Sequence, residues 1–150
     1  MRALRIGLIS DTHNLLRPEA LAWLHGCDHI LHAGDICGEA VLDALRAIAP
    51  LTAVRGNNDV GPWAKRLHST ETVRFGDVMV HMVHDIAELA LPAGVRVVVT
   101  GHSHKPKVEE RDGVLYVNPG SAGPRRFKLP ISAGELRIDG SEVSAHLVTF

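Results

Sequence analysis

Residues 4–13 read LRIGLISDTH, an apolar run of strand length that ends in polar residues. We interpret Leu4–Ser10 as a buried strand. Downstream, runs with helical spacing alternate with short apolar runs: Pro18–His25, Asp28–Ala33, Glu39–Ile48 and Leu51–Arg55. This strand–helix alternation predicts a parallel sheet whose crossover connections are right-handed.

The second half of the chain is rich in strand-like runs. Asp-Gly pairs, which favour tight hairpin turns, stand at Asp112-Gly113 and Asp139-Gly140. The strands that we predict are Thr70–Phe75, Val78–Val83, Arg96–Thr100, Lys107–Arg111, Val114–Asn118, Glu135–Ile138 and Glu142–Val148. Together the two halves predict two sheets that pack on each other, with helices outside.

Composition is that of an ordinary globular protein. The chain has 150 residues, of which 45% are hydrophobic and 22% charged, so we expect a single domain over residues 1–150. A net charge of −1 shows no excess of basic residues of the kind that general nucleic-acid binding or binding to a membrane surface requires. Two cysteines form no disulfide framework, and we identify no signal peptide and no transmembrane run. We therefore expect a cytoplasmic location.

Histidine is unusually frequent, with ten residues. Polar clusters directly follow predicted strands: Asp11-Thr12-His13, Gly34-Asp35, Gly56-Asn57-Asn58-Asp59, His84 and Gly101-His102-Ser103-His104. Groups at the carboxyl ends of strands converge on one crevice in open α/β sheets. Two aspartates, four histidines and one asparagine exceed what one divalent ion needs. Oxygen and imidazole donors without thiolates favour manganese, iron or zinc in a catalytic site with two metal ions.

The ordered series D-x-H, G-D, G-N-x-D, H and G-H-x-H resembles the calcineurin-like metallophosphoesterase superfamily, and the compact length resembles its small YfcE-like phosphodiesterase branch. The resemblance implies an α/β fold, a four-layer α/β/β/α sandwich of two mixed sheets flanked by helices. It implies two ligand sets that share one aspartate: Asp11, His13, Asp35 and His104 for one ion, and Asp35, Asn57, His84 and His102 for the other. It also implies that a hydroxide bridging the ions attacks phosphorus without a covalent enzyme intermediate.

The resemblance extends to catalysis and substrate binding. Many relatives have a histidine at the position of Asn58, and an amide cannot act as a general acid near neutral pH. This departure favours phosphodiester substrates whose leaving groups are stabilised. We expect Asn58 and Asp35 to be the catalytic residues. Asn118–Ser121 resembles a loop near the site, so we expect Ser121, Arg125 and Asn57 to bind substrate. Another departure is Asp85, where relatives often have glycine.

The prediction is thus a phosphodiesterase that uses two divalent ions, manganese first and iron, zinc, nickel or cobalt as alternatives. We expect it to bind a small phosphodiester substrate and not to bind a membrane. The segment around Phe127 is a candidate contact for a homo-oligomer, whereas Arg126 and Trp63 have no assigned role. The alternatives are a phosphomonoesterase or protein phosphatase of the same superfamily, and a catalytically silent metal-binding scaffold. The retromer scaffold subunit of eukaryotes resembles the same branch.

Overall fold

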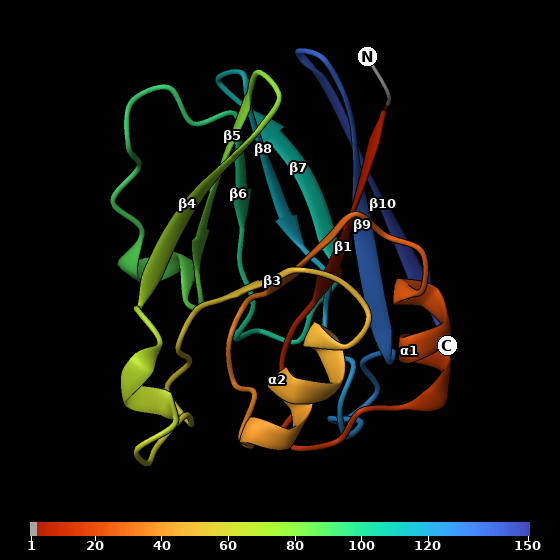
Figure 1. Cartoon of the computed structure of the whole chain (residues 1–150). Helices are drawn as coiled ribbons and strands as arrows, with labels where there is room; N and C mark the ends of the chain where they lie inside the picture. The colour runs from red at the N-terminus through yellow and green to blue at the C-terminus, as the bar shows by residue number, and fades with distance from the viewer. Residues whose placement is uncertain (1–2) are drawn as a thin grey trace.

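Two mixed sheets pack face to face in the computed structural model, which describes residues 3–150 (Figure 1). Within these residues, each sheet has five strands. Sheet A contains, in spatial order, β10 (Glu142–Thr149), β9 (Ser132–Asp139), β1 (Leu4–Ile9), β2 (His29–His32) and β3 (Leu51–Ala53). Sheet B contains β4 (Thr70–Phe75), β5 (Val78–Val83), β6 (Val97–Val99), β8 (Val114–Asn118) and β7 (Lys107–Arg111).

Both sheets have a parallel centre and antiparallel edges. In sheet A, β1, β2 and β3 are parallel, and the hairpin β9–β10 adds to β1 in antiparallel orientation. In sheet B, β5, β6 and β8 are parallel, with β4 and β7 antiparallel at the two edges. The predicted hairpin at Asp112-Gly113 is confirmed, and both residues have the positive φ that a type I′ turn requires, 51° and 78°.

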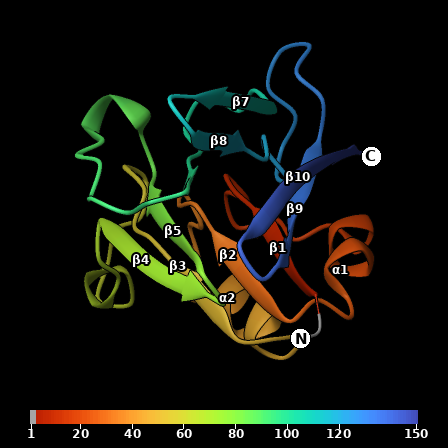
Figure 2. The same cartoon turned by 90° about the horizontal axis from the view of Figure 1, so that it is seen from above.

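Helices α1 (Pro18–Leu24) and α2 (Glu39–Arg46) cover the outer face of sheet A (Figure 2). Helix α2 buries the apolar side of its surface, Val41, Leu42 and Leu45, against that sheet. Beside sheet B, the connection from β5 to β6 forms only the 3₁₀ turn η2 (Ile86–Glu88), and a second turn, η1 (Ala64–Arg66), follows β3. None of the helices within residues 3–150 has the length and hydropathy needed to cross a bilayer.

The core lies between the sheets and is built from alternate residues of each strand. Ile6 and Leu8 of β1 face Val80 and Met82 of β5, and all four side chains are fully buried. Removing this apolar surface from water is the main force that holds the sheets together. The predicted sandwich of two mixed sheets is therefore confirmed.

The parallel strands place their carboxyl ends at one end of the sandwich. Strands β1, β2 and β3 run in the same direction, as do β5 and β6. Each of the five polar clusters singled out in the sequence begins within three residues of the end of one of these strands. The loops that carry chemistry are thus gathered by the strand order rather than by closeness in sequence.

Candidate metal centre

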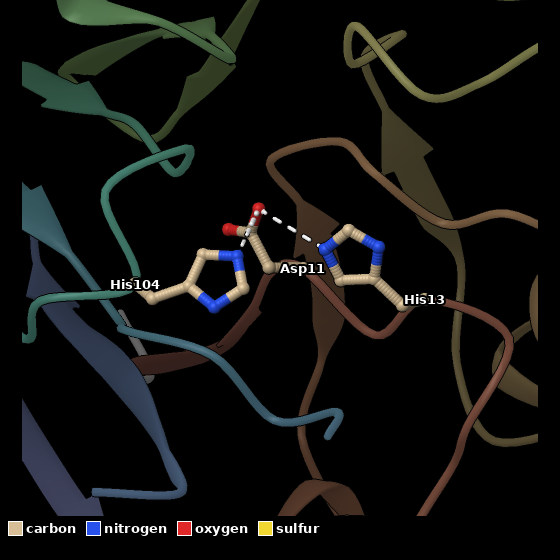
Figure 3. Close-up of side chains that lie close together, drawn as sticks. All are labelled: Asp11, His13 and His104. Carbon is tan, nitrogen blue, oxygen red and sulfur yellow. Dashed lines mark ion pairs between the residues drawn. The ribbon is translucent and has the colours of Figure 1, made fainter. Parts of the chain in front are cut away.

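Two compact groups of ligand-type side chains meet at this end of the sandwich. Figure 3 shows the first group, in which the Asp11 Oδ1 atom lies 3.4 Å from His104 Nε2 and 4.0 Å from His13 Nε2. In the second group, His84 Nε2 lies 3.4 Å from Asp35 Oδ2 and 3.9 Å from Asp11 Oδ1. Five of the predicted ligands are therefore within reach of common ions.

Both carboxylates face both groups. Asp35 Oδ2 lies 3.4 Å from His84 Nε2 and 3.7 Å from His13 Nε2. Asp11 Oδ1 is likewise within 4.0 Å of His13, His84 and His104. The carboxylates of Asp35 and Asp11 therefore both lie between the two groups of histidines.

Asn57 and His102 lie beside the second group. The His102 Nδ1 and Asn57 Oδ1 atoms are 3.2 Å apart, and the His102 ring meets the His84 ring edge-on at 5.2 Å between centroids. The other ring nitrogen of His102 lies 3.7 Å from Asp85 Oδ2. The structure therefore brings Asn57 and His102 to the same place as the other predicted ligands, on its more exposed side.

Backbone strain is concentrated at the ligands. Five of the seven predicted ligands have positive φ angles that non-glycine residues rarely adopt: Asp11 (54°), His13 (45°), Asp35 (57°), His102 (69°) and His104 (62°). Such conformations cost about 1–3 kcal/mol each and persist only where the surroundings enforce them. The turns that follow β1, β2 and β6 are thus shaped to direct side chains into one pocket.

Glycines in three of the motifs allow the loops to approach one another. A Cβ atom on Gly101 would collide with Ser10 Oγ and Asp11 Oδ2, and one on Gly56 would collide with the Asp35 backbone and carboxylate. Gly34 has a φ of 101° and lies against the Gly56 backbone. These positions need glycine because a ligand or a ligand loop occupies the space of a side chain.

Several atoms that could ligate a metal at this centre have no hydrogen-bond partner among the described residues. Asp11 is fully buried, and its Oδ2 atom accepts hydrogen bonds from Ser10 Oγ (2.6 Å) and the His102 backbone N–H (3.1 Å). The remaining buried atoms without a hydrogen-bond partner include Asp11 Oδ1, His13 Nε2 and His84 Nε2. Buried polar atoms are normally satisfied, so these orphaned atoms, which face one another, fit cation binding.

His84 is oriented to ligate through Nε2. Its Nδ1 atom donates a 2.7 Å hydrogen bond to the Ala33 carbonyl, which leaves Nε2 without a proton in the neutral ring. Burial lowers the pKa of His84, but the carboxylates of Asp35 and Asp11 outweigh it and the net shift is upward. Burial raises the pKa of Asp35, but the neighbouring His84 ring and the hydrogen bonds from Asn58 outweigh burial and the net shift is downward, so Asp35 is ionised.

Asp59 joins two of the ligand loops. Its carboxylate accepts hydrogen bonds from the backbone N–H groups of Gly56 (2.8 Å), Asp35 (3.0 Å) and Cys37 (2.8 Å). The Cys37 thiol lies 3.6 Å from His13 Nδ1, but burial and the nearby carboxylates raise its pKa to about 11. In the absence of a metal ion, Cys37 is thus a neutral thiol at neutral pH.

Asn58 lies against Asp35 at the mouth of the pocket. Its backbone N–H donates to Asp35 Oδ1 and its side-chain amide donates to Asp35 Oδ2, both at 2.9 Å. Asn58 is exposed to solvent, as a residue that meets substrate must be. The amide therefore orients the carboxylate that lies between the two ligand groups.

Ser121, expected to contact substrate, is buried instead. Only 3% of the surface of Ser121 is exposed, and its hydroxyl donates a 3.0 Å hydrogen bond to the Asp11 carbonyl. This bond holds the backbone of a ligand and leaves no hydroxyl proton for a phosphate. Arg125 lies on the exposed segment that follows, outside the two ligand groups.

His32, the last residue of β2, supports the first ligand loop. It is fully buried, accepts a hydrogen bond from the Gly34 N–H at Nδ1 (3.1 Å) and lies 3.1 Å from Thr12 Oγ1. The Thr12 hydroxyl donates to the Ile36 carbonyl, so the His32 Nε2–H donates to Thr12. Ser10, which donates to Asp11, is not singled out by the sequence, because no pattern distinguishes it from other residues at strand ends.

Known proteins resemble this chain in sequence and in structure. Residues 4–141 match the model of the calcineurin-like phosphoesterase superfamily domain. A probable metallophosphoesterase of Methanothermobacter thermautotrophicus is 33% identical, over 95% of this chain and 91% of the relative.

Two solved structures share the fold over nearly the whole chain. An archaeal phosphodiesterase superposes with a TM-score of 0.80 at 25% identity, over 97% of this chain and 100% of the other. Vps29 of Entamoeba histolytica, solved with zinc, superposes with a TM-score of 0.74 at 23% identity, over 97% and 99% of the two chains.

His32 makes the protein sensitive to acid. Burial lowers the His32 pKa from 6.5 to about 3, because the charged ring would lose its hydration inside the protein. Between these values the unfolded chain binds a proton that the folded protein does not, so stability falls as pH drops below 6.5. From pH 7.5 to pH 5, we expect the metal-free protein to lose about 2 kcal/mol more unfolding free energy than His32→Asn loses.

Urea denaturation at both pH values, in the presence of a chelator, measures this difference. The comparison uses the change with pH, so a constant effect of the substitution on stability does not enter. Equal losses in the two proteins would show that His32 is not buried in its neutral form.

Proposed function

Because the chain belongs to the calcineurin-like phosphoesterase superfamily, we propose that it is a phosphodiesterase that works with two divalent metal ions. The observation that carries the proposal is the set of orphaned donor atoms: Asp11 Oδ1, His13 Nε2 and His84 Nε2. They lie in contacts of 4.0 Å or less with one another and with Asp35 and His104. Within residues 3–150, no lysine or arginine lies within ion-pair distance of the Asp11 or Asp35 carboxylate.

The residues present can divide between two ions. His13 and His104 would hold one, His84, His102 and Asn57 the other, and the carboxylates of Asp11 and Asp35 reach both groups. Nitrogen and oxygen donors suit manganese first, with iron, zinc, nickel or cobalt as alternatives. When bound, two such ions would lower the pKa of a coordinated water molecule and would neutralise charge on the phosphoryl oxygens.

The chain's own residues position the reaction. Asp59, Ser121 and His32 fix the loops that carry the ligands, so the pocket needs little rearrangement when a phosphate enters. Water attacks phosphorus in line with the ester oxygen, the P–O bond breaks, and the products are a phosphomonoester and an alcohol. Asn58 can donate a hydrogen bond at the mouth of the pocket but cannot deliver a proton to the departing alkoxide.

Two observations bear on the alternatives. A phosphomonoesterase or protein phosphatase of the same superfamily would need a general acid to protonate its poor leaving groups. The position where that acid would act holds Asn58, whose amide cannot deliver a proton. The similarity in fold to Vps29 favours a different candidate, a metal-binding scaffold without catalysis. All seven ligand positions are filled by residues that can coordinate a metal, which favours the enzyme over the scaffold.

Hydrolysis of bis-p-nitrophenyl phosphate with added Mn²⁺ tests the proposal. We expect release of p-nitrophenolate by the wild type and a loss of at least about 100-fold in kcat for Asp35→Asn, because the substitution removes charge between the two ligand groups. Metal analysis should show fewer bound ions in the same variant. Asp43→Asn, an exposed carboxylate on α2 whose side chain is 69% exposed, is the matched control and should behave like the wild type.

Two results would contradict this account. Two tightly bound ions without turnover of any phosphoester would favour the scaffold. Full activity of Asp35→Asn would remove Asp35 from the centre.

Leaving-group dependence tests the role given to Asn58. A histidine at this position has a pKa near neutrality and can protonate a departing alkoxide, an effect worth about 10²–10⁴-fold. We expect Asn58→His to raise kcat for diphenyl phosphate at least about tenfold more than for bis-p-nitrophenyl phosphate, whose leaving group needs no proton. If both substrates change by the same factor, the missing-acid explanation is wrong.

A further inference from the structure

The Cys37 thiol lies between two residues of the candidate metal centre. Its Sγ atom is 3.6 Å from His13 Nδ1 and 3.8 Å from the Asn58 carbonyl oxygen, distances at which a thiol forms weak hydrogen bonds. Cys37 has a positive φ of 64°, and its backbone N–H donates a 2.8 Å hydrogen bond to Asp59 Oδ1. The backbone therefore holds the thiol at a fixed place beside the His13 ring.

The two ring nitrogens of His13 face different groups. Nε2 lies 3.7 Å from Asp35 Oδ2 and 4.0 Å from Asp11 Oδ1, and it has no hydrogen-bond partner within residues 3–150. Figure 3 shows this nitrogen directed toward Asp11 and the other ring nitrogen, Nδ1, on the far side of the ring. A neutral imidazole carries one N–H proton, so Nε2 can offer a lone pair to a cation only when that proton is on Nδ1.

The sulfur can accept the Nδ1 proton. Among the described residues, Cys37 Sγ is the one hydrogen-bond partner of His13 Nδ1. The thiol's own proton is donated to the Asn58 carbonyl, which leaves the sulfur lone pairs free to face the histidine. The hydrogen bonds then run in one direction, from His13 Nδ1–H to the sulfur and from S–H to the Asn58 carbonyl. This direction selects the His13 tautomer in which Nε2 is open.

The other histidines of the two ligand groups are held differently. The Ala33 carbonyl accepts a 2.7 Å hydrogen bond from His84 Nδ1, whereas His104 Nδ1 is buried without a hydrogen-bond partner in residues 3–150. The His13 side chain is 28% exposed, compared with 5% for each of the other two, so packing restrains the His13 ring least. A specific contact on Nδ1 therefore matters most at His13.

We propose that Cys37 is a positioning residue of the metal centre, which accepts the Nδ1 proton of His13 and thereby directs the Nε2 lone pair toward the cation. The thiol neither binds the ion nor attacks the substrate. Asp35 and Cys37 stand two residues apart, so one loop supplies both a carboxylate and the contact that orients a histidine. The inference rests on the metal binding that the proposed function requires.

Titration calorimetry with Mn²⁺ on protein freed of metal by a chelator tests this role. We expect Cys37→Ala to weaken the binding of one ion about 10–100-fold, because the His13 proton loses its acceptor. Cys37→Ser keeps a group that both donates and accepts, and should bind Mn²⁺ as tightly as the wild type. Cys27→Ala removes the chain's other thiol, which is buried in the apolar cluster beneath α1 and α2, and is the matched control.

Nitrogen-15 NMR of the histidine rings reports the tautomer without metal. At a pH where the rings are neutral, we expect the wild-type His13 ring to carry its proton on Nδ1. In Cys37→Ala, part of the population should shift to the form protonated on Nε2, and Cys37→Ser should resemble the wild type. A residue that only fills space would leave the tautomer unchanged.

A Cys37→Ala protein that binds Mn²⁺ as tightly as the wild type would overturn the positioning role. So would a Cys37→Ser protein that binds as weakly as Cys37→Ala, or a wild-type His13 ring protonated on Nε2. If no phosphoester is hydrolysed but Cys37→Ala weakens Mn²⁺ binding and Cys37→Ser does not, the proposed function fails and the positioning role stands.

Discussion

A fully buried carboxylate oxygen without a partner is the constraint on which the site depends. Asp11 Oδ1 lies within 4.0 Å of three imidazole nitrogens and accepts no hydrogen bond. A buried carboxylate oxygen without a partner is strongly destabilising. Cations placed between these atoms would satisfy the carboxylate and the imidazoles together. Binding of metal and stability of this end of the sandwich are therefore expected to be linked.

The loops keep these atoms together through backbone geometry rather than through apolar packing. Several candidate ligands have positive φ angles, and neighbouring glycines stand where no side chain would fit. The Asp59 carboxylate joins two of the loops through three hydrogen bonds. The sheets behind them are closely packed and hold the loop ends at fixed positions. A rigid scaffold with strained loops is the arrangement by which proteins position charged groups before substrate arrives.

Local patterns predicted most of the fold. The bounds of β4 and β5 agree with the sequence expectation because the turn residues Gly76-Asp77 separate two strand-like runs, and the polar clusters do follow parallel strands. The antiparallel pairing of β9 with β1 was not predicted, because these strands are separated by most of the chain and no local pattern encodes their contact. Burial of Ser121 and the central position of Asp11 depend on how loops meet in space, which motif spacing alone does not describe.

Anomalous diffraction from crystals grown with Mn²⁺ would test the central claim most directly. Two anomalous peaks about 3.5–4 Å apart are predicted, with Asp35 in contact with both. His13 and His104 should contact one peak, and His84 and His102 the other. A single peak, or peaks away from Asp11 and Asp35, would contradict a centre built for two cations.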